Sequence, residues 1–318
     1  MATMTDPTDL ATTQKDEHSS HEYHADAHVL SGRLERPIEQ KIEEHAPVSL
    51  KGRRSGHLTR TTEDVSIEGL VTVDKGHTRV SGSKSLKPGH GWVTLSTSMI
   101  EGLNVFEIIT ADRLVSQVST EHPEKDGHFP HVTFLGTQFN NLQVSGIPLK
   151  VRLNYSVCGP KPAGDRSYLD DLAFLEAVKD RTEKVARSGH LPKAAQAEYD
   201  KRLNGVNQLI GNKGSKSSGR PNGGVGDGPS VICSLVTDID KSIEESIPGV
   251  HVIGHVLVIP DFGTVSLGEV KVGERWYDPK DARPSNYFEL MVIKMNLGCV
   301  GTGIVNGGGS SANGHTRP

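Results

Sequence analysis

The chain has 318 residues, with 35 basic and 39 acidic side chains and a formal net charge of −4. This near balance gives no electrostatic case for nucleic-acid binding, and no apolar run of about 18 residues is present to cross a membrane as a helix. Apolar residues make up only 34% of the chain and glycines number 35. We therefore expect part of the chain to lie outside a packed core.

The first residues lack a basic segment followed by an apolar one, so a standard secretory signal is absent. Cys158, Cys233 and Cys299 lie far apart and form no Cys-x-x-Cys pair. That spacing fits neither a disulfide scaffold nor a zinc ribbon. We expect free thiols and a cytoplasmic protein, with a signal-less route to the surface or the extracellular space as the alternative.

Residues 1–62 are polar and charged and show no sustained apolar period. Such a stretch buries too little apolar area to offset its ordering entropy, so we predict a disordered polar arm. Its one basic cluster, at 51–54, is expected to be a flexible linker.

Histidines are frequent in this arm. If it becomes helical, His21, His24 and His28 share one face and could hold a transition metal; the alternative is a solvated polar arm. The order His21-Glu-Tyr-His24 lacks the zinc-protease pattern. Further on, His251 and His255 lie in an apolar strand about 13 Å apart, so we expect buried, hydrogen-bonded histidines rather than ligands of one metal.

From about residue 66 the apolar residues follow a period of two, which indicates strands. In 92–99 this pattern predicts a half-buried strand, since Val93, Leu95 and Met99 alternate with Thr94, Ser96 and Ser98. A turn is expected at 110–112. Ser145-Gly146, between two short apolar runs, is typical of a two-residue hairpin turn.

Residues 167–210 break this pattern. Tyr168, Leu172 and Leu175 lie at i, i+4 and i+7, and a second stripe runs through 199–210. This spacing predicts a helical hairpin inserted in the β body. The run of Gly, Ser, Asn and Lys over 211–228 predicts a flexible loop.

Strands are expected again at 231–236, 251–259, 264–272 and 287–297, with a short helix within 238–246, and the segment 301–318 is rich in glycine and predicts a flexible tail. The many short strands indicate a mainly β fold: an antiparallel β-sandwich or jelly-roll-like body over 63–300, with the helical hairpin and disordered termini.

Three motifs occur in order: Val105-Phe-Glu-Ile-Ile-Thr-Ala-Asp112, Leu142-Gln-Val-Ser-Gly-Ile-Pro148 and Ile259-Pro-Asp-Phe-Gly263. With these three motifs in this order, the chain resembles, over about residues 65–300, the β domain of bacterial choice-of-anchor surface proteins. The resemblance implies an all-β module of secreted or wall-anchored proteins without assigned activity. From the residues themselves we expect turn-forming roles at these motifs, with a metal or ligand role for Asp112 as the alternative.

The loop at 122–131 combines histidines with acids. Asp126, His128 and His131 could bind a ligand or a metal, or act as acid and base, while a polar hairpin loop is the alternative. Trp276 and Tyr277 are candidates for an aromatic platform that binds a glycan. No catalytic residue and no cofactor are assigned.

The favoured function is therefore a non-catalytic structural or interaction protein. It would assemble as a homo-oligomer or filament, or dock on protein partners, through its sandwich and its extended arm. The first alternative is a metal-dependent or acid–base enzyme that uses the 122–131 loop. The second is a glycan-binding module.

Overall fold

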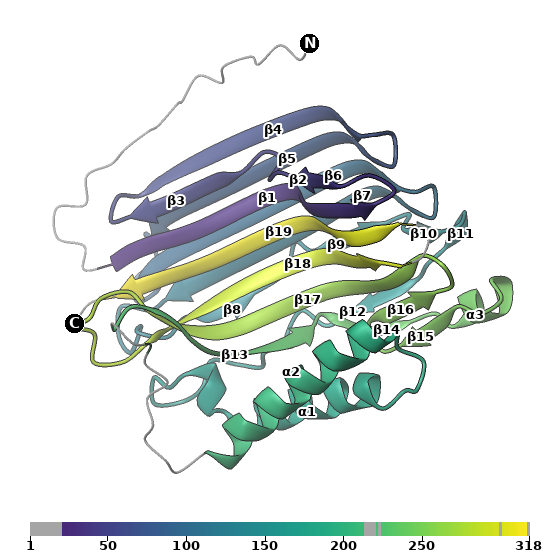
Figure 1. The fold of residues 1–318 in the computed structure, drawn as a ribbon. Helices are drawn as coiled ribbons and strands as arrows, with labels where there is room; N and C mark the ends of the chain where they lie inside the picture. Colours follow the sequence, from purple (N-terminus) through teal and green to yellow (C-terminus); the bar gives the residue numbers. More distant parts are fainter. Residues whose placement is uncertain (1–20, 213–220, 222–223, 299–300, 317–318) are drawn as a thin grey trace.

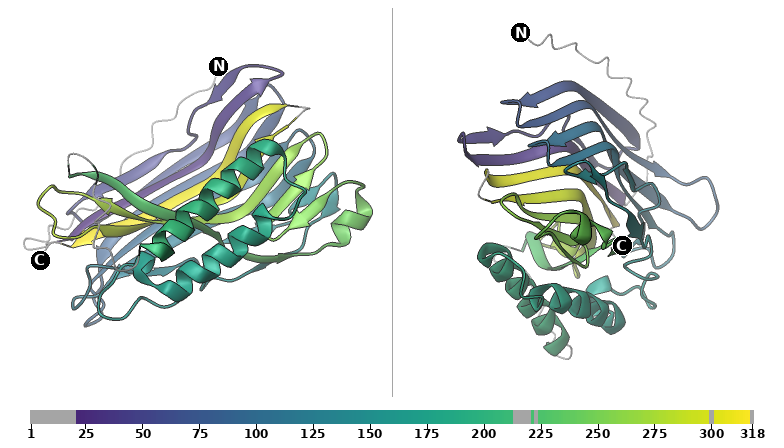
Figure 2. Two further views of the ribbon diagram at one scale, coloured as in Figure 1. Left: turned by 60° about the horizontal axis from the view of Figure 1, so that its bottom comes forward. Right: turned by 90° about the vertical axis from the view of Figure 1, so that its right-hand side faces the viewer.

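The computed structural model describes residues 21–212, 221, 224–298 and 301–316. Two antiparallel sheets stack face to face, and a pair of helices lies along one side of them (Figures 1 and 2). The prediction of a mainly β sandwich with a helical hairpin is confirmed.

The first sheet has nine strands. Its main path runs, in spatial order, through β15 (His251–Ile253), β16 (Val256–Ile259), β17 (Gly263–Trp276), β18 (Ser285–Leu297), β19 (Thr302–Thr316), β1 (His21–Arg36) and β2 (Gln40–Ile42). Off this path, β13 (Gly226–Ser234) pairs with β17, and β3 (Val48–Gly52) pairs with β1. The predicted strand at 287–297 is confirmed as part of β18, which lies between β17 and β19.

The second sheet has eight strands. Its main path runs through β11 (Ile147–Pro148), β10 (Gln143–Val144), β7 (Ile109–His122), β6 (Trp92–Val105), β5 (Val71–Lys84) and β4 (Gly56–Ile67). Off this path, β8 (His131–Thr133) and β9 (Gln138–Asn140) pair with β7. A small ladder joins β12 (Val151–Leu153) to β14 (Val236–Ile239).

The helical segment consists of the short helix η1 (Tyr168–Asp170), α1 (Leu172–Ala186) and α2 (Lys193–Gly211), and α3 (Ser242–Ser246) follows β14. Asp171 starts α1 because its carboxylate accepts hydrogen bonds from the Ala173 and Phe174 amides. Phe174 and Leu175 then pack against Phe288 of β18 in one buried cluster. The predicted hairpin and the short helix are confirmed. The predicted loop at 211–228 lies partly outside the described residues, and its last residues, from Gly226, belong to β13 instead.

The prediction of a disordered arm is wrong for residues 21–62. The 16-residue strand β1 lies inside the first sheet, between β19 on one side and β2 and β3 on the other. Its alternating pattern was hidden because two of its buried positions, Ala25 and Ala27, are small. The remaining part of that prediction, residues 1–20, lies outside the described residues.

The prediction of a flexible tail is wrong for residues 301–316. They form β19, which pairs along its length with β18 and β1. Glycine is frequent here because bulky side chains occupy the space where a Cβ would stand. A Cβ on Gly307 would lie 3.1 Å from Ile100, and one on Gly314 would lie 2.3 Å from the His21 ring.

The two sheets lie close together where hydroxyl side chains of one sheet bond to backbone carbonyls of the other. The Ser96 hydroxyl donates to the Asp26 carbonyl (2.7 Å) and Ser98 donates to the His28 carbonyl (2.8 Å), so β6 is bonded to β1 in the facing sheet. The inner face of β6 is therefore polar in its first half, whereas Ile100, Leu103 and Val105 make its second half apolar. The predicted half-buried strand at 92–99 is confirmed as part of β6, with Thr94, Ser96 and Ser98 on its buried face and Val93, Leu95 and Met99 half-buried on the other.

Turn positions were predicted with mixed success. The Ser145-Gly146 turn is confirmed: both residues have positive φ and they join β10 to β11. The predicted turn at 110–112 is wrong, because the chain turns earlier, at Phe106 and Glu107, whose φ values are 55° and 57°. Asp112 therefore lies within β7, where its carboxylate accepts a hydrogen bond from the Asn141 side chain (3.1 Å).

Replacing Gly314 with alanine is expected to lower the free energy of unfolding by about 1–3 kcal/mol, because a Cβ there forces the His21 ring out of its place. Chemical denaturation measures this loss. Gly205→Ala is the matched control: Gly205 lies within α2 with nothing within 4 Å of its Cβ position, and the change is expected to stabilise the helix by up to about 1 kcal/mol. Equal stability of the Gly314→Ala variant and the wild type would contradict this packing.

Candidate functional site

One end of the sandwich holds a cluster of four histidines from four separate segments, which we call the histidine cluster (His21, His122, His128 and His315). His21 begins β1, His122 ends β7, His128 lies in the following loop, and His315 is near the end of β19. The ring centroids of His21 and His122 are 4.8 Å apart, and those of His128 and His315 are 6.3 Å apart. The fold thus brings together residues of the predicted arm and residues of the predicted loop.

Hydrogen bonds fix these rings to the ends of the strands. His122 Nδ1 donates to the Gly127 carbonyl (2.7 Å), and His128 Nε2 donates to the Pro284 carbonyl (2.8 Å). His315 Nδ1 lies 2.9 Å from the Ser285 hydroxyl, and its Nε2 lies 3.2 Å from an Asp281 carboxylate oxygen. A histidine that donates to a backbone carbonyl is held in one orientation, so these bonds tie the 123–131 loop to the sheets.

Burial keeps His21 and His122 in the neutral form. His21 and His122 are fully buried. Desolvation lowers the pKa of His122 to about 3 and that of His21 further below its usual range, and neighbouring imidazoles add to both shifts. Groups with such pKa values exchange no proton near neutral pH, so the arrangement supports locking of the strand ends rather than acid–base chemistry.

The three histidines predicted as metal ligands do not converge. Because side chains alternate along a strand, His21 points between the sheets, whereas His24 and His28 lie on the opposite face of β1. The His24 ring stacks on Tyr277 at 4.3 Å, and His28 Nε2 lies 3.1 Å from the Ser31 hydroxyl. Within the described residues, no group of three or more His, Cys, Asp or Glu side chains is placed to hold a metal ion.

The other predicted ligand residues are also dispersed. In the loop, Asp126 and His131 are exposed, whereas His128 is half-buried and turned towards Pro284. Trp276 is 3% exposed, and Tyr277 packs between His24 and His315. A glycan platform needs open aromatic faces, and the buried Trp276 offers none. Glycan binding at the half-buried Tyr277 stays a prediction.

A buried charge network was missed by the sequence analysis. The Arg202 guanidinium of α2 donates to both carboxylate oxygens of Glu269 on β17, at 2.7 and 3.2 Å. The Tyr199 hydroxyl donates to Glu269 (3.4 Å) and lies 3.1 Å from His255 Nε2, which confirms the expectation of a buried, hydrogen-bonded His255. Burial by itself raises the pKa of Glu269, but the bonds from His255 and Arg202 outweigh it and hold that pKa far below its usual range. The network fastens α2 to the sheet.

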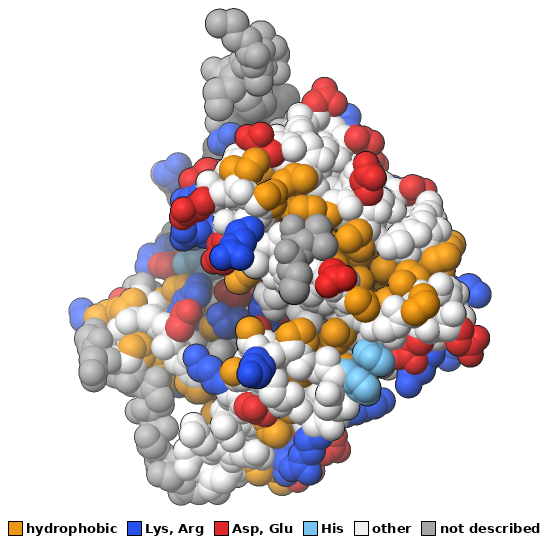
Figure 3. Space-filling view, turned by 45° about the vertical axis from the view of Figure 1, so that its right-hand side comes forward, with side chains coloured by type: hydrophobic (Ala, Val, Ile, Leu, Met, Phe, Trp, Pro, Cys, Tyr) orange, Lys and Arg blue, Asp and Glu red, His pale blue; other side chains and the backbone are white. Residues whose placement is uncertain are grey.

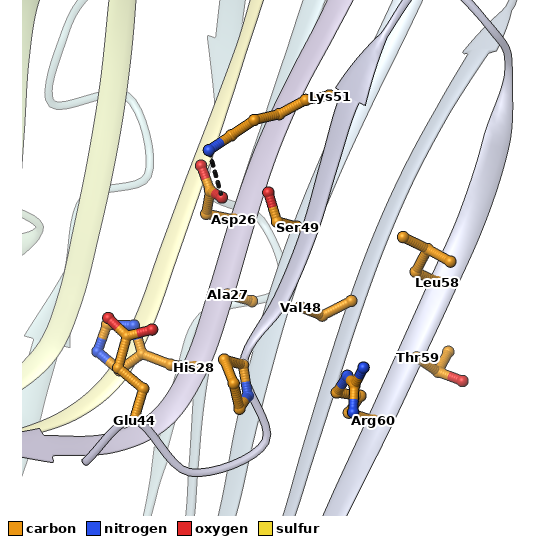
Figure 4. Close-up of a pocket in the computed structure, with 11 residues that line it drawn as sticks. Asp26, Ala27, His28, Glu44, Val48, Ser49, Lys51, Leu58, Thr59 and Arg60 are labelled. Carbon is orange, nitrogen blue, oxygen red and sulfur yellow. Dashed lines mark ion pairs between the residues drawn. The ribbon is translucent and has the colours of Figure 1, made fainter. Parts of the chain in front are cut away.

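An open groove lies on the opposite side of the sandwich from the helices (Figures 1 and 4). Residues of β1, β3 and β4 line a volume of about 680 Å³, with Asp26 and Lys51 paired at 3.6 Å on one side and Arg60 on the other. Strand β4 forms the edge of its sheet here and pairs only with β5 among the described residues. Its backbone groups on the groove side are therefore available to another strand.

The charge distribution gives no single-sign surface on the face that Figure 3 shows, where acidic and basic side chains are interspersed between apolar ones. Among the described helices, none is long and apolar enough to span a bilayer. The chain therefore presents an open strand edge and, on the face that Figure 3 shows, a surface of mixed charge.

Comparison with known proteins gives one match. Neither a curated protein nor a solved structure matches this chain. One protein family matches residues 21–273, a region that begins with β1 and ends within β17. The matched region covers more than half of the chain. The chain belongs to the family described as Domain of unknown function (DUF8256).

Proposed function

We propose that this protein is a non-catalytic interaction module that assembles with further copies of itself by strand addition at the β4 edge. The observation that carries the proposal is β4 itself. It has 12 residues, more than any other strand at a sheet edge in the described part of the chain, and it is mostly exposed. A free edge of this length supplies enough main-chain groups for another strand to pair with it.

The first half of β4 favours such pairing. Residues 56–62 contain no proline and only one charged side chain, Arg60, while Thr59, Thr61 and Thr62 suit an extended backbone. Charges appear only beyond them, at Glu63 and Asp64. Edge strands that remain solitary are usually shielded by several charges, a proline or a covering element.

Two lysines on this edge test the proposal. We expect the wild-type chain to sediment as a concentration-dependent oligomer, and the double variant Thr59→Lys, Thr61→Lys to sediment as a monomer with an unchanged circular dichroism spectrum, because added charge disfavours edge pairing. The matched control, Asn204→Lys with Asn207→Lys, adds the same charge to the exposed side of α2 and should behave as the wild type. A wild-type chain that is monomeric at every concentration contradicts the proposal.

A further inference from the structure

We propose that the strand added at the β4 edge is the segment 1–20 of a second copy of this chain. This inference rests on the proposed function and identifies the part of the partner that binds. Three observations support it: the charge of the groove and of the segment, the length of the segment, and the direction in which β1 enters the sheet.

Two unpaired arginines beside the groove, Arg54 and Arg60, complement the charge of the segment. Residues 1–20 contain four acids, Asp6, Asp9, Asp16 and Glu17, and one base, Lys15. The groove is lined by Lys51 and Arg60 and also by Asp26 and Glu44, and Lys51 pairs with Asp26. Arg53, which pairs with Glu22 at 3.0 Å, and Arg54 stand in the connection from β3 to β4. Arg54 and Arg60 form no ion pair with any described residue, so their guanidinium groups can donate hydrogen bonds to a partner's carboxylates.

The segment is long enough to cover the edge. Twenty extended residues span about 66 Å, whereas the 12 residues of β4 span about 40 Å. The segment also contains five threonines, which favour an extended conformation. A strand along the whole of β4 therefore leaves several residues to connect the two molecules.

The direction of the chain favours a second copy over the same copy. Tyr23 of β1 pairs with Gly52, the last residue of β3, and β4 begins four residues later at Gly56. Strands β1 and β4 thus start at the same end and run in the same direction (Figure 1). To lie along its own β4, the segment would have to reverse immediately before His21, whereas a straight continuation of β1 leads away from the molecule towards a neighbour.

Disulfide trapping between full-length variants tests this inference. One variant carries Thr12→Cys and the other carries Thr61→Cys, and the two are mixed in equal amounts under a mild thiol oxidant. We expect a mixed disulfide that joins the two variants and is absent when Asn207→Cys, on α2, replaces Thr61→Cys. As a second measurement, Arg60→Glu is expected to weaken self-association about tenfold, because the partner's acids then meet an acid.

The outcomes separate the inference from the proposed function. A third variant carries both Thr12→Cys and Thr61→Cys in one chain. If a disulfide forms only within this variant and not between the two single variants, the inference is overturned, since the segment then covers its own edge. No disulfide, with an oligomer that the two lysines on β4 still dissociate, also overturns the inference but leaves assembly at this edge intact. A chain that is monomeric throughout overturns both.

Discussion

Lowering the pH from 7 to 5 is expected to reduce the free energy of unfolding by about 4 kcal/mol. The cause is the burial of His21 and His122, whose pKa values lie far below the 6.5 of an unfolded histidine. Above pH 6.5 both states are neutral and stability does not depend on these rings. Below pH 6.5 these two histidines bind protons in the unfolded chain but not in the folded chain. Each of them therefore lowers the free energy of unfolding by about 1.4 kcal/mol per pH unit, until the pH reaches its pKa in the folded state.

Denaturant unfolding at several pH values measures this slope. His122→Gln is expected to remove about half of it, because an amide can still donate to the Gly127 carbonyl but does not titrate. His131→Gln is the matched control, since His131 is an exposed imidazole in the same region of the chain, and it should leave the slope unchanged. If His122→Gln and the wild type lose stability equally on acidification, the histidine cluster does not set the pH dependence.

Removing Arg202 is expected to cost about 3–5 kcal/mol, because Arg202→Met leaves the Glu269 carboxylate buried without its main partner. The double variant Arg202→Met, Glu269→Leu should recover much of that loss, since no unpaired charge remains. Thermal or chemical denaturation gives both values.

Arg152→Met is the matched control for this prediction. Arg152 pairs with Asp238 at 3.9 Å, and its side chain is 83% exposed, so the expected change lies within about 0.5 kcal/mol. A loss of stability in Arg202→Met no larger than in Arg152→Met would show that the network does not fasten α2 to the sheet.

The parts of the fold that could be predicted are those whose buried residues are large and apolar. Strand β18, with Phe288, Leu290 and Val292 on its buried face, showed the period of two, and α1 showed the helical spacing of Leu175 and Val178. In these segments the hydrophobic pattern lies within one stretch of sequence, so the periodicity of that stretch is sufficient to predict the element.

Strands β1 and β19 could not be predicted because their packing is shared with other strands. Gly82 leaves room for Tyr23, and Gly307 leaves room for Ile100, so small residues on one sheet accommodate large residues on the other. A glycine-rich stretch then has the composition of a loop although it is a central strand. The buried face of β6 is similarly difficult to recognise from the sequence. Its Ser96 and Ser98 are polar residues, and they lie between the sheets because their hydroxyls donate to backbone carbonyls of β1.

The candidate sites were harder still to predict. The histidine cluster joins residues 294 positions apart, His21 and His315, and no local spacing relates them. The same is true of Arg202 and Glu269, which meet only when α2 folds back on β17. The resemblance to the β domain of choice-of-anchor proteins stays a prediction, as does residence in the cytoplasm.

Sedimentation velocity of the full chain across a wide range of concentrations tests the central claim, assembly at the β4 edge, most directly. We predict species larger than the 34.3 kDa of one chain, which dissociate on dilution and are abolished by Thr59→Lys with Thr61→Lys but not by Asn204→Lys with Asn207→Lys. A single species of one chain's mass at every concentration, or an oligomer that persists with both lysines on β4, would contradict the claim.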